Sequence, residues 1–496
     1  MDGCPPTASE PACRWPFAQP PWANYDGFLM DETATPSRRL AEWCASLGWN
    51  EIPPEVRAVL PLRLLDTTGL ILAGAHTPAG EAALAFTRDN AGAPRSTVAG
   101  SGERVPASAA ALVHGIEAHC HDFDDTFMDS VVHPGSVVIP AALALAEAEA
   151  STDEDFAVAV TVGYEVAARI GAVAGRRFHA RSLHPTGIVG PLAAAVTAAR
   201  LLALSGEQTS WAMGLAASMS GGLRAFAVDG GWSKWLHAGW AAHGGIVAAQ
   251  LARQGYRGPE HVLDGGYDLF SALLHGEVPD RSGLTHELGQ SWQGFDAVFK
   301  YYPCAHVIQP FIDAVLAVVR QHDLKPADIA DIECRIAPWA ATIVCEPRAD
   351  KLCPATALGA IGSLPYQLAV AVADRRVGLS AIEPATRERR DIRAFAERVR
   401  HREDAALGRA FDGEICLRTI DGTRHVRRAT VGGVDTVRLR DKFVDLVGPL
   451  IGADEAGKAA ARLLDAEGPA WRWAVDMFSE AAGRDPSAST SRKEKN

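Results

Sequence analysis

A dense group of titratable side chains between two apolar segments is the feature that most restricts how this chain can fold. Within thirteen residues lie three carboxylates and two histidines, with a further carboxylate among them: His121, Asp122, Asp124, Asp125, Asp129 and His133. The flanking segments, 107–118 and 137–148, are rich in Ala and are typical of buried helices. An unpaired buried carboxylate is costly or takes up a proton, so these groups need partners.

Two interpretations of this segment stay open. Acid–base catalysis uses carboxylates and imidazoles whose surroundings tune their pKa values toward neutral pH. The simpler alternative is a polar loop that caps the two helices, with Asp125 or Asp129 as an N-cap residue.

Length and charge exclude several classes of protein. The chain has 496 residues, more than the ~250–300 at which a single core stops growing, so we expect two domains. A net charge of −12 lacks the basic footprint of nucleic-acid-binding proteins, and we expect no nucleic-acid partner. Nine cysteines without a C-x-x-C pair favour a reducing compartment, so we expect a cytoplasmic protein. No apolar run reaches ~20 residues free of charge and glycine, so we expect no membrane span.

The first part of the chain, 36–282, has apolar residues at helical spacing in one segment after another, and we expect a helical domain there. Pro53 and Pro54 open the first helix, which is expected to run to Ala75. Further helices are predicted at 107–118, 137–148, 155–173, 189–204, 207–219 and 238–254. A short strand is expected at 96–99.

The composition changes near residue 283. Residues that favour strands predict β-structure at 295–302, 329–336, 343–344, 415–419 and 425–431. Asp421-Gly422 predicts a hairpin turn between the last two strands. With helices expected at 307–322 and 363–372, residues 283–438 form a predicted α+β domain. A last helical part is expected at 439–480 and includes one stretch at 440–464; a flexible arm is expected at 1–35 and a disordered tail at 481–496.

Two helix starts carry polar residues suited to a site. His184-Pro185-Thr186-Gly187 opens one helix, and the free N–H groups of a helix N-terminus suit a carboxylate ligand. The alternative is that Thr186 caps this helix and His184 lies on the surface. Lys234, which is followed by His237, comes after a Gly-rich turn that permits close backbone approach, although a lone lysine there is commonly a solvated charge.

The second part of the chain has candidates of its own. Lys300 and His306 are six residues apart across a predicted strand-to-helix turn and can converge on one anion. Tyr366, at the start of a predicted helix, either lends its hydroxyl to a site or packs. Cys304 reads as a buried structural cysteine, since no neighbouring pattern supports a thiolate nucleophile.

A metal site or a nucleotide site is not expected. His119, His121, Asp122, Asp124 and His133 include ligand types, but their spacing matches neither a zinc nor a calcium motif. No glycine-rich phosphate-binding motif is present, so no nucleotide cofactor is indicated.

Taken in order, seven short motifs resemble the MmgE/PrpD family, which includes 2-methylcitrate dehydratase, cis-aconitate decarboxylase and iminodisuccinate epimerase. The likeness spans roughly residues 39–452 and rests on 65–69, 122–126 with His133-Pro134, 184–187, Lys234 with 236–239, Lys300 with Tyr302-Pro303, 363–366, and Lys442-Phe443. Seven motifs in the right order are far more specific than any one of them.

The resemblance implies a mainly α fold, with a large all-helical domain formed by both chain ends and a smaller α+β lid domain. It also implies a homodimer and a metal-free site between the domains, without a cofactor. By motif matching, the family's functional positions fall on Asp122, His133, His184, Lys234, Lys300 and Tyr366. Whether His306 or Gln309 completes the lid side stays open.

Substrates of this family are small di- or tricarboxylates, and the shared problem is to make or protonate a carbanion beside a carboxylate. Lys234 and Lys300 suit the stabilisation of the developing charge and, with His306 and His237, the binding of substrate carboxylates. His133 suits the proton transfer, with Asp122 orienting its imidazole. We therefore expect a lyase, either a dehydratase or a decarboxylase. The alternatives are an epimerase and, more distantly, a non-catalytic helical binding protein.

Overall fold

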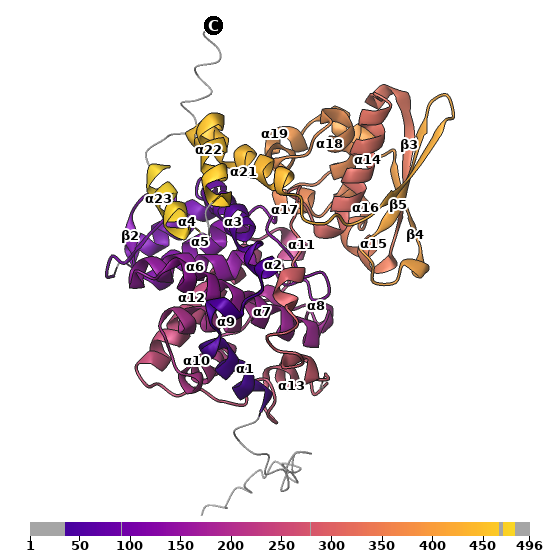
Figure 1. Cartoon of the computed structure of the whole chain (residues 1–496). Helices are drawn as coiled ribbons and strands as arrows, with labels where there is room; N and C mark the ends of the chain where they lie inside the picture. The colour runs from indigo at the N-terminus through magenta and orange to yellow at the C-terminus, as the bar shows by residue number, and fades with distance from the viewer. Residues whose placement is uncertain (1–34, 91, 278, 466–469, 482–496) are drawn as a thin grey trace, which may run out of the picture.

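The computed structural model of the protein describes residues 35–90, 92–277, 279–465 and 470–481. The predicted arm and tail fall almost entirely outside these residues. The described chain is mainly α-helical, as the sequence predicts. It has two hydrophobic cores, one built from 40–299 together with 439–481 and the other from 302–429. Figure 1 shows a larger helical body and a smaller part that carries the four-stranded sheet.

The helical body is a set of long helices with short connections: α1 Pro36–Ser46, α3 Leu60–Gly74, α4 Pro78–Asp89, α5 Ala107–His119, α6 Gly135–Glu149, α7 Asp153–Ala174, α9 Pro185–Leu201, α10 Gly206–Ser218 and α12 Ser233–Arg253. Shorter helices lie between or beside them: α2 Pro54–Arg57, α8 Arg177–Ala180, α11 Phe226–Asp229 and α13 Leu269–Leu273. Small residues let the helices touch: a Cβ on Gly115 of α5 would lie 2.6 Å from the Cα of Gly239 of α12. Glycine at this crossing therefore brings together the two helices that carry His119 and Lys234.

Three helix starts differ from the prediction. The segment expected as one helix over 54–75 is divided into α2 and α3, because Pro61 lacks the N–H of an interior position and instead occupies the first turn of α3. The helices α9 and α12 begin four and five residues earlier than the predicted 189 and 238. Their added first turns carry the polar residues of the candidate site.

A mixed sheet forms the outer part of the smaller core. Its strands are β3 Ile329–Ile336, β4 Val399–Glu403, β5 Gly413–Thr419 and β6 Arg424–Ala429, in the order β4-β3-β5-β6. The pair β3/β4 is parallel, and β3/β5 and β5/β6 are antiparallel. The helices α14 Gln309–Gln321 and α18 Leu364–Asp374 pack against this sheet, and the shorter helices are α15 Pro338–Val344, α16 Arg348–Leu352, α17 Ala357–Ile361, α19 Pro384–Arg387 and α20 Arg390–Ala396.

The strand predictions are partly confirmed. The strands at 329–336 and 415–419 and the hairpin at Asp421-Gly422 are present, and Gly422 has a φ of +89° that favours glycine. The strand expected at 295–302 is wrong: a short 3₁₀ helix covers 293–296, and only Val298 forms a bridge, to Thr126. The strand expected at 343–344 is also wrong, because Pro338 starts a helix that continues to Val344.

The last helices return to the helical body. They are α21 Thr436–Ile451, α22 Ala453–Leu464 and α23 Trp471–Glu480, and Gly452, with a φ of +96°, separates the first two. Both α21 and α22 pack against α3, and Figure 1 shows these C-terminal helices beside the N-terminal ones. The pair β1 Ser96–Thr97 and β2 Arg104–Val105 forms a small separate ribbon.

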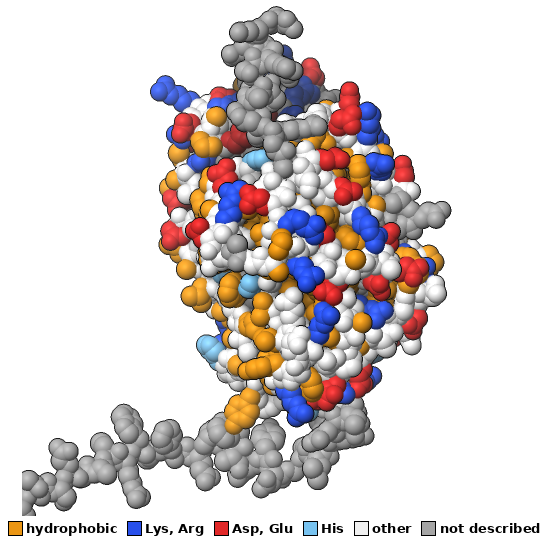
Figure 2. All heavy atoms as spheres, turned by 90° about the vertical axis from the view of Figure 1, so that its left-hand side faces the viewer, with side chains coloured by type: hydrophobic (Ala, Val, Ile, Leu, Met, Phe, Trp, Pro, Cys, Tyr) orange, Lys and Arg blue, Asp and Glu red, His pale blue; other side chains and the backbone are white. Residues whose placement is uncertain are grey.

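Within the described residues, α7 is the one single helix long and apolar enough to cross a membrane, and 94% of its apolar window is buried among the other helices. The bent pair α2–α3 with α4 passes the same length and composition test only if it is counted as one broken span. Burial of this extent is what the central helix of a packed domain shows. Figure 2 shows Lys and Arg side chains mixed with Asp and Glu on one face, with hydrophobic side chains gathered toward its lower half.

Candidate active site

The predicted site residues of the helical body and of the connection to the smaller core lie close together. Asp122 and His133 belong to the loop between α5 and α6, His184 is the N-cap residue of α9, and Lys234 lies in the first turn of α12. Lys300 lies where the chain passes from one core to the other. Each of these side chains is at most 9% exposed, so the site is closed to bulk solvent in this conformation.

Asp122 is the centre of the charged group. Its Oδ1 lies 2.7 Å from Nζ of Lys234 and 2.7 Å from Nζ of Lys300. The Lys300 ammonium also donates to the main-chain oxygen of Asp122 at 2.7 Å. Asp122 has a φ of +48°, in the left-handed region that a short polar side chain tolerates better than most. The turn aims its carboxylate at both lysines.

These contacts shift the pKa values of Asp122 and Lys234. Burial raises the pKa of Asp122, but the adjacent Lys234 and Lys300 outweigh it and hold this pKa well below its usual value. Burial lowers the pKa of Lys234, and the positive charge of Lys300 adds to that shift while Asp122 opposes it. Asp122 is therefore ionised at neutral pH.

His133 has one ring nitrogen that is hydrogen-bonded to the backbone and one that faces the other site residues. Its Nδ1 lies 3.0 Å from the main-chain oxygen of Asp125, which can only accept, so Nδ1 carries the proton. In the neutral ring Nε2 is then unprotonated, and it lies 3.9 Å from Oδ1 of Asp122. Burial, together with Lys300 and the other nearby positive groups, lowers the pKa of His133 well below its usual value despite Asp124. A neutral imidazole with a free Nε2 suits proton transfer.

A second carboxylate–imidazole pair, which the sequence reasoning did not place in the site, lies beside the first. Nδ1 of His119 is 2.9 Å from Oδ2 of Asp124, and both side chains are buried. Burial raises the pKa of Asp124, but His119 and His133 outweigh burial and hold this pKa well below its usual value, so Asp124 is ionised. Nε2 of His119 is buried without a hydrogen-bond partner among the described residues. The position of His119, three residues before Asp122 at the end of an apolar helix, was the available signal.

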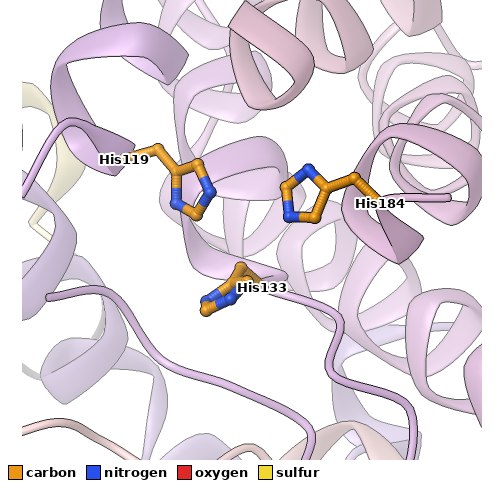
Figure 3. Close-up of side chains that lie close together, drawn as sticks. All are labelled: His119, His133 and His184. Atoms are coloured by element: carbon orange, nitrogen blue, oxygen red, sulfur yellow. The ribbon is translucent and has the colours of Figure 1, made fainter. Parts of the chain in front are cut away.

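His184 extends the group of imidazoles. Its ring stacks on that of His119, with centroids 5.7 Å apart, and its Nδ1 lies 3.1 Å from Nδ1 of His237. Its Nε2 is buried and has no hydrogen-bond partner within the part of the chain that the structure describes. Figure 3 shows the rings of His119, His133 and His184 turned toward one another. Thr186 does not cap α9 and instead accepts a hydrogen bond from the His133 amide.

On the lid side, the structure distinguishes the two candidates left open by the sequence. The Gln309 side chain accepts from the amides of Tyr301 and Tyr302 and donates to the carbonyl of Tyr302, so it braces its own loop. His306 instead has a buried Nδ1 without a hydrogen-bond partner in the described chain. Burial lowers the pKa of His306 to about 3, and Lys300 adds to the shift while Asp122 opposes it, so this ring faces the same charges.

Tyr366 lies outside the group, and Cys304, although it feels Lys300 and Asp122, adds no nucleophile to it. The Tyr366 hydroxyl donates to the carbonyl of Ala381 at 2.6 Å, and its electrostatic neighbours are the Arg and Asp side chains of α18 to α20. The structure therefore favours the packing alternative for Tyr366. Burial raises the pKa of the Cys304 thiol, as expected of a structural cysteine.

Neither Asp125 nor Asp129 is an N-cap residue, because Pro134 holds that position in α6, but Asp125 does bind the first turn of this helix. Its Oδ1 accepts from the amide of Gly135 at the start of α6, and its Oδ2 binds Arg63 at 2.7 Å and the Tyr164 hydroxyl at 2.9 Å. Asp129 is exposed and caps neither helix. The segment thus combines a structural carboxylate, Asp125, with the group around Asp122.

The imidazoles could in principle hold a cation. Ligand atoms of His119, His133 and His184 all lie within 4.8 Å of one another, as do those of the set His119, Asp122, Asp124 and His133. Two lysine ammonium groups lie beside these atoms and oppose a cation, although the ionised Asp122 and Asp124 offset their charge. The N–H donors of Lys234 that have no partner in the described chain suit an acceptor-rich ligand.

A buried site rich in lysine and histidine, at the junction of a helical body and a smaller α+β part, is the defining feature of the molecule. The chain belongs to the MmgE/PrpD family. The family's N-terminal domain matches residues 38–282, and its C-terminal domain matches residues 302–466. The second match begins at 302, where the smaller core begins, but it continues to 466 and so includes α21 and α22, which pack in the larger core.

Curated relatives share part of this sequence. The chain is 31% identical to the cis-aconitate decarboxylase-like protein oryM of Aspergillus oryzae, 34% to cis-aconitate decarboxylase of Homo sapiens, and 26% to cis-aconitate decarboxylase of Aspergillus terreus. These similarities cover 57%, 52% and 59% of this chain. They cover 61%, 54% and 62% of the respective relatives, so the match spans just over half of their length.

Proposed function

We propose that the protein is a lyase that acts on a small di- or tricarboxylate, with decarboxylation of a cis-aconitate-like acid as the reaction. The observation that carries this proposal is a buried group of lysine N–H donors and imidazole nitrogens, several of which have no hydrogen-bond partner in the described chain. Lys234 has three N–H donors and a single contact, with Asp122, while buried ring nitrogens of His119 and His184 have no partner in the described chain. A ligand rich in carboxylate oxygens satisfies such a group.

The two lysines hold the substrate and stabilise charge. Lys234 comes from the helical body and Lys300 from the connection to the smaller core, so they approach a ligand from two directions. Fixed ammonium groups in a site that excludes water stabilise developing negative charge far better than they do in solution. His306 and His237 add further nitrogens beside the lysines and suit the remaining carboxylates.

The reaction needs one proton, which an imidazole supplies. Carbon dioxide leaves from the methylene carboxylate, the electron pair of that bond forms a new double bond, and the old double bond takes a proton at its far carbon. The product is an unsaturated dicarboxylate. A bound polyanion raises the pKa of a neighbouring imidazole, so His133 becomes able to hold and donate this proton through Nε2.

Closure of the site fits this chemistry. A ligand can reach side chains that are at most 9% exposed only if the smaller part moves away from the helical body. Closure then removes water, which strengthens the electrostatic contacts and protects the carbanion-like intermediate. His306 lies on the side of the smaller core, whereas Lys300 lies at the boundary between the two cores.

A panel of acids in deuterated water, followed by NMR, tests the proposal. Release of carbon dioxide from cis-aconitate with deuterium in the product supports it. Loss or gain of water with a hydroxy-tricarboxylate would instead indicate a dehydratase, and exchange without net reaction would indicate an epimerase. No change with any acid would contradict the proposal. Protein unfolded by heat serves as the control for uncatalysed decarboxylation.

A further inference from the structure

Lys442 of α21 is a buried lysine that the proposed reaction does not use. Its Nζ lies 2.6 Å from Oδ1 of Asp66 on α3. It also donates to the main-chain oxygen of Phe123 at 2.7 Å and to that of Lys300 at 3.0 Å. The side chain is 3% exposed, and Nζ lies 3.9 Å from the centre of the Phe123 ring.

The two carbonyl groups held by Lys442 belong to the backbone of the candidate site. Phe123 directly follows Asp122, and the other carbonyl is that of Lys300 itself. The Lys300 side chain runs back to the main-chain oxygen and Oδ1 of Asp122, at 2.7 Å each. Lys300 and Lys442 thus both link the loop at Asp122-Phe123 to the connection at residue 300. Lys300 makes this link within the site, and Lys442 makes it from α21.

The C-terminal helices reach the backbone of the site through Lys442, while Arg438, also on α21, lies over the rings of Tyr301 and Tyr302 in the connection. Lys442 donates both to the loop after α5, at the carbonyl of Phe123, and to the connection between the cores, at the carbonyl of Lys300. Because α21 packs against α3, the ammonium group is fixed from the helical body and not from the lid. It therefore gives Lys300 a rigid reference point at the boundary between the two cores.

We propose that Lys442 is a positioning residue that sets the placement of Lys300 relative to Asp122. The expected effect on catalysis rests on the proposed function, whereas the expected effect on the position of Lys300 does not. A misplacement of about 1 Å in a reacting site can cost about 100-fold in rate. Loss of the two carbonyl contacts is expected to cause a loss of this size in kcat.

The competing explanation is that Lys442 only neutralises Asp66. A buried carboxylate left without its partner destabilises a protein strongly, and Lys442→Met alone cannot separate the two roles. The double variant Asp66→Asn/Lys442→Met removes the charge of both groups and leaves no buried unpaired ion. Asp66→Asn alone keeps the lysine and both of its carbonyl contacts.

The structure supplies a matched control. Arg169 and Glu165 form another buried ion pair, at 2.7 Å, and Arg169 donates to the carbonyls of Gly283, His286 and Ser291. These carbonyls lie in the segment that precedes Lys300, at residues 283–291, and in the described chain the hydrogen bonds from Arg169 are made to them and not to the carbonyls of Phe123 or Lys300. The double variant Glu165→Gln/Arg169→Met therefore removes an equivalent pair that holds backbone elsewhere.

The experiment compares the stability and the kcat of these variants. We expect Asp66→Asn/Lys442→Met to unfold at a temperature close to that of the control pair and yet to lose about 100-fold in kcat. The control pair and Asp66→Asn alone should keep kcat within a few-fold of wild type. If the Asp66/Lys442 double variant kept wild-type kcat, or if the control pair lost as much, Lys442 would have no positioning role.

A crystal structure of the Asp66/Lys442 double variant decides the matter even if the proposed reaction is wrong. The distance from Nζ of Lys300 to Oδ1 of Asp122 is 2.7 Å in the native chain. We expect it to lengthen beyond hydrogen-bonding range in the double variant and to stay unchanged in the control pair. An unchanged distance in both would overturn the inference, whatever the kinetics show. Failure of the wild-type protein to turn over any carboxylate would count only against the proposed function.

Discussion

The ammonium nitrogen of Lys300 lies 2.7 Å from both the main-chain oxygen and the carboxylate Oδ1 of Asp122, although the two residues are 178 positions apart. Asp122 has left-handed backbone geometry, which costs an L-residue about 1–2 kcal/mol. Lys300 stands at the passage between the two cores. The contact therefore links the charged loop of the helical body to the connection between the two cores.

Lys234→Met is expected to raise KM and lower kcat/KM by about 10- to 100-fold, because a charge-assisted hydrogen bond contributes about 1.5–3 kcal/mol. The matched control is Lys458→Met, since Lys458 also pairs with one carboxylate at 2.7 Å but is 72% exposed. Steady-state kinetics on the active acid, with circular dichroism for the fold, is the measurement. Equal kinetics for both variants would remove Lys234 from substrate binding.

His133→Asn is expected to reduce kcat by about 10²- to 10⁴-fold while the fold remains intact, because a proton-transfer group acts mainly in the transition state. In the free enzyme the pKa of His133 lies well below its usual value of 6.5, through burial and the nearby positive groups. Because His133 must carry a proton to act as the acid, kcat/KM should fall as the pH rises through this pKa, so the basic limb of kcat/KM should begin below pH 6.5. Near-wild-type kcat in this variant would transfer the role to His119, His184 or His306.

Elements with a strong local pattern could be predicted from the sequence. The strand β3 has three isoleucines and alternates apolar with polar residues from Ile332 to Ile336, and the long Ala-rich helices have clear periodicity. The strand β4 was missed because its sequence, VRHRE, is the charged pattern of an edge strand. The segment 295–302 has the aromatic and β-branched residues of a strand but serves as a connection, and only tertiary contacts decide that.

For the candidate site too, residues with a local sequence signal could be predicted, and residues that depend on contacts distant in the sequence could not. Asp122, His133, His184, Lys234 and Lys300 could be chosen because each lies at a helix end or a turn. Lys442 and Asp66 each lie within a helix, and neither helix shows which partner it meets. Tyr366 also looked like a site residue from its position at a helix start. Its hydroxyl partner, Ala381, is 15 residues away and could not be read from the sequence.

Acid should destabilise the fold through buried histidines. Burial lowers the pKa of His114 to about 3 from its usual 6.5. The folded state therefore binds fewer protons than the unfolded state in this window, and stability is full above pH 6.5 and is lost as the pH falls toward 3. The loss is about 1.4 kcal/mol per pH unit for one such group. Burial raises the pKa of Asp66 from 3.8 to about 6. Between these two values Asp66 therefore makes the fold more stable as the pH falls, which opposes the effect of His114.

Urea unfolding at a series of pH values checks the role of His114. In His114→Gln the side-chain oxygen can still accept from the amide of Ala99, as Nε2 of His114 does at 3.1 Å. This variant should lose stability less steeply below pH 6.5 than the native chain does. The control is His286→Gln, because the side chain of His286 is 71% exposed. Parallel curves for His114→Gln and the native chain would show that His114 does not titrate as the structure indicates.

Removal of metal ions is expected to leave activity unchanged, because two lysines occupy the space beside the three imidazoles. The measurement is kcat after exhaustive chelation and again after addition of single divalent metals. A loss of activity that one specific metal restores would show instead that His119, His133 and His184 hold that metal.

We expect a homodimer, as the family resemblance implies. Leu236 and Trp240 lie four residues apart on α12 and are 45% and 48% exposed, which is unusual for large apolar side chains unless they meet a partner. Sedimentation at micromolar concentration should give about twice the chain mass of 52.6 kDa, and Trp240→Glu should weaken the association. A species of 52.6 kDa under these conditions would contradict the prediction.

A crystal structure with a saturated tricarboxylate, which binds like the proposed substrate but has no double bond to protonate, tests the central claim most directly. The account predicts a closed complex in which carboxylate oxygens lie within hydrogen-bonding distance of Nζ of Lys234 and Lys300, and of ring nitrogens that lack a partner in the free chain. A ligand bound elsewhere, or a site in which Lys234 keeps Asp122 as its one partner at saturating ligand, would contradict it.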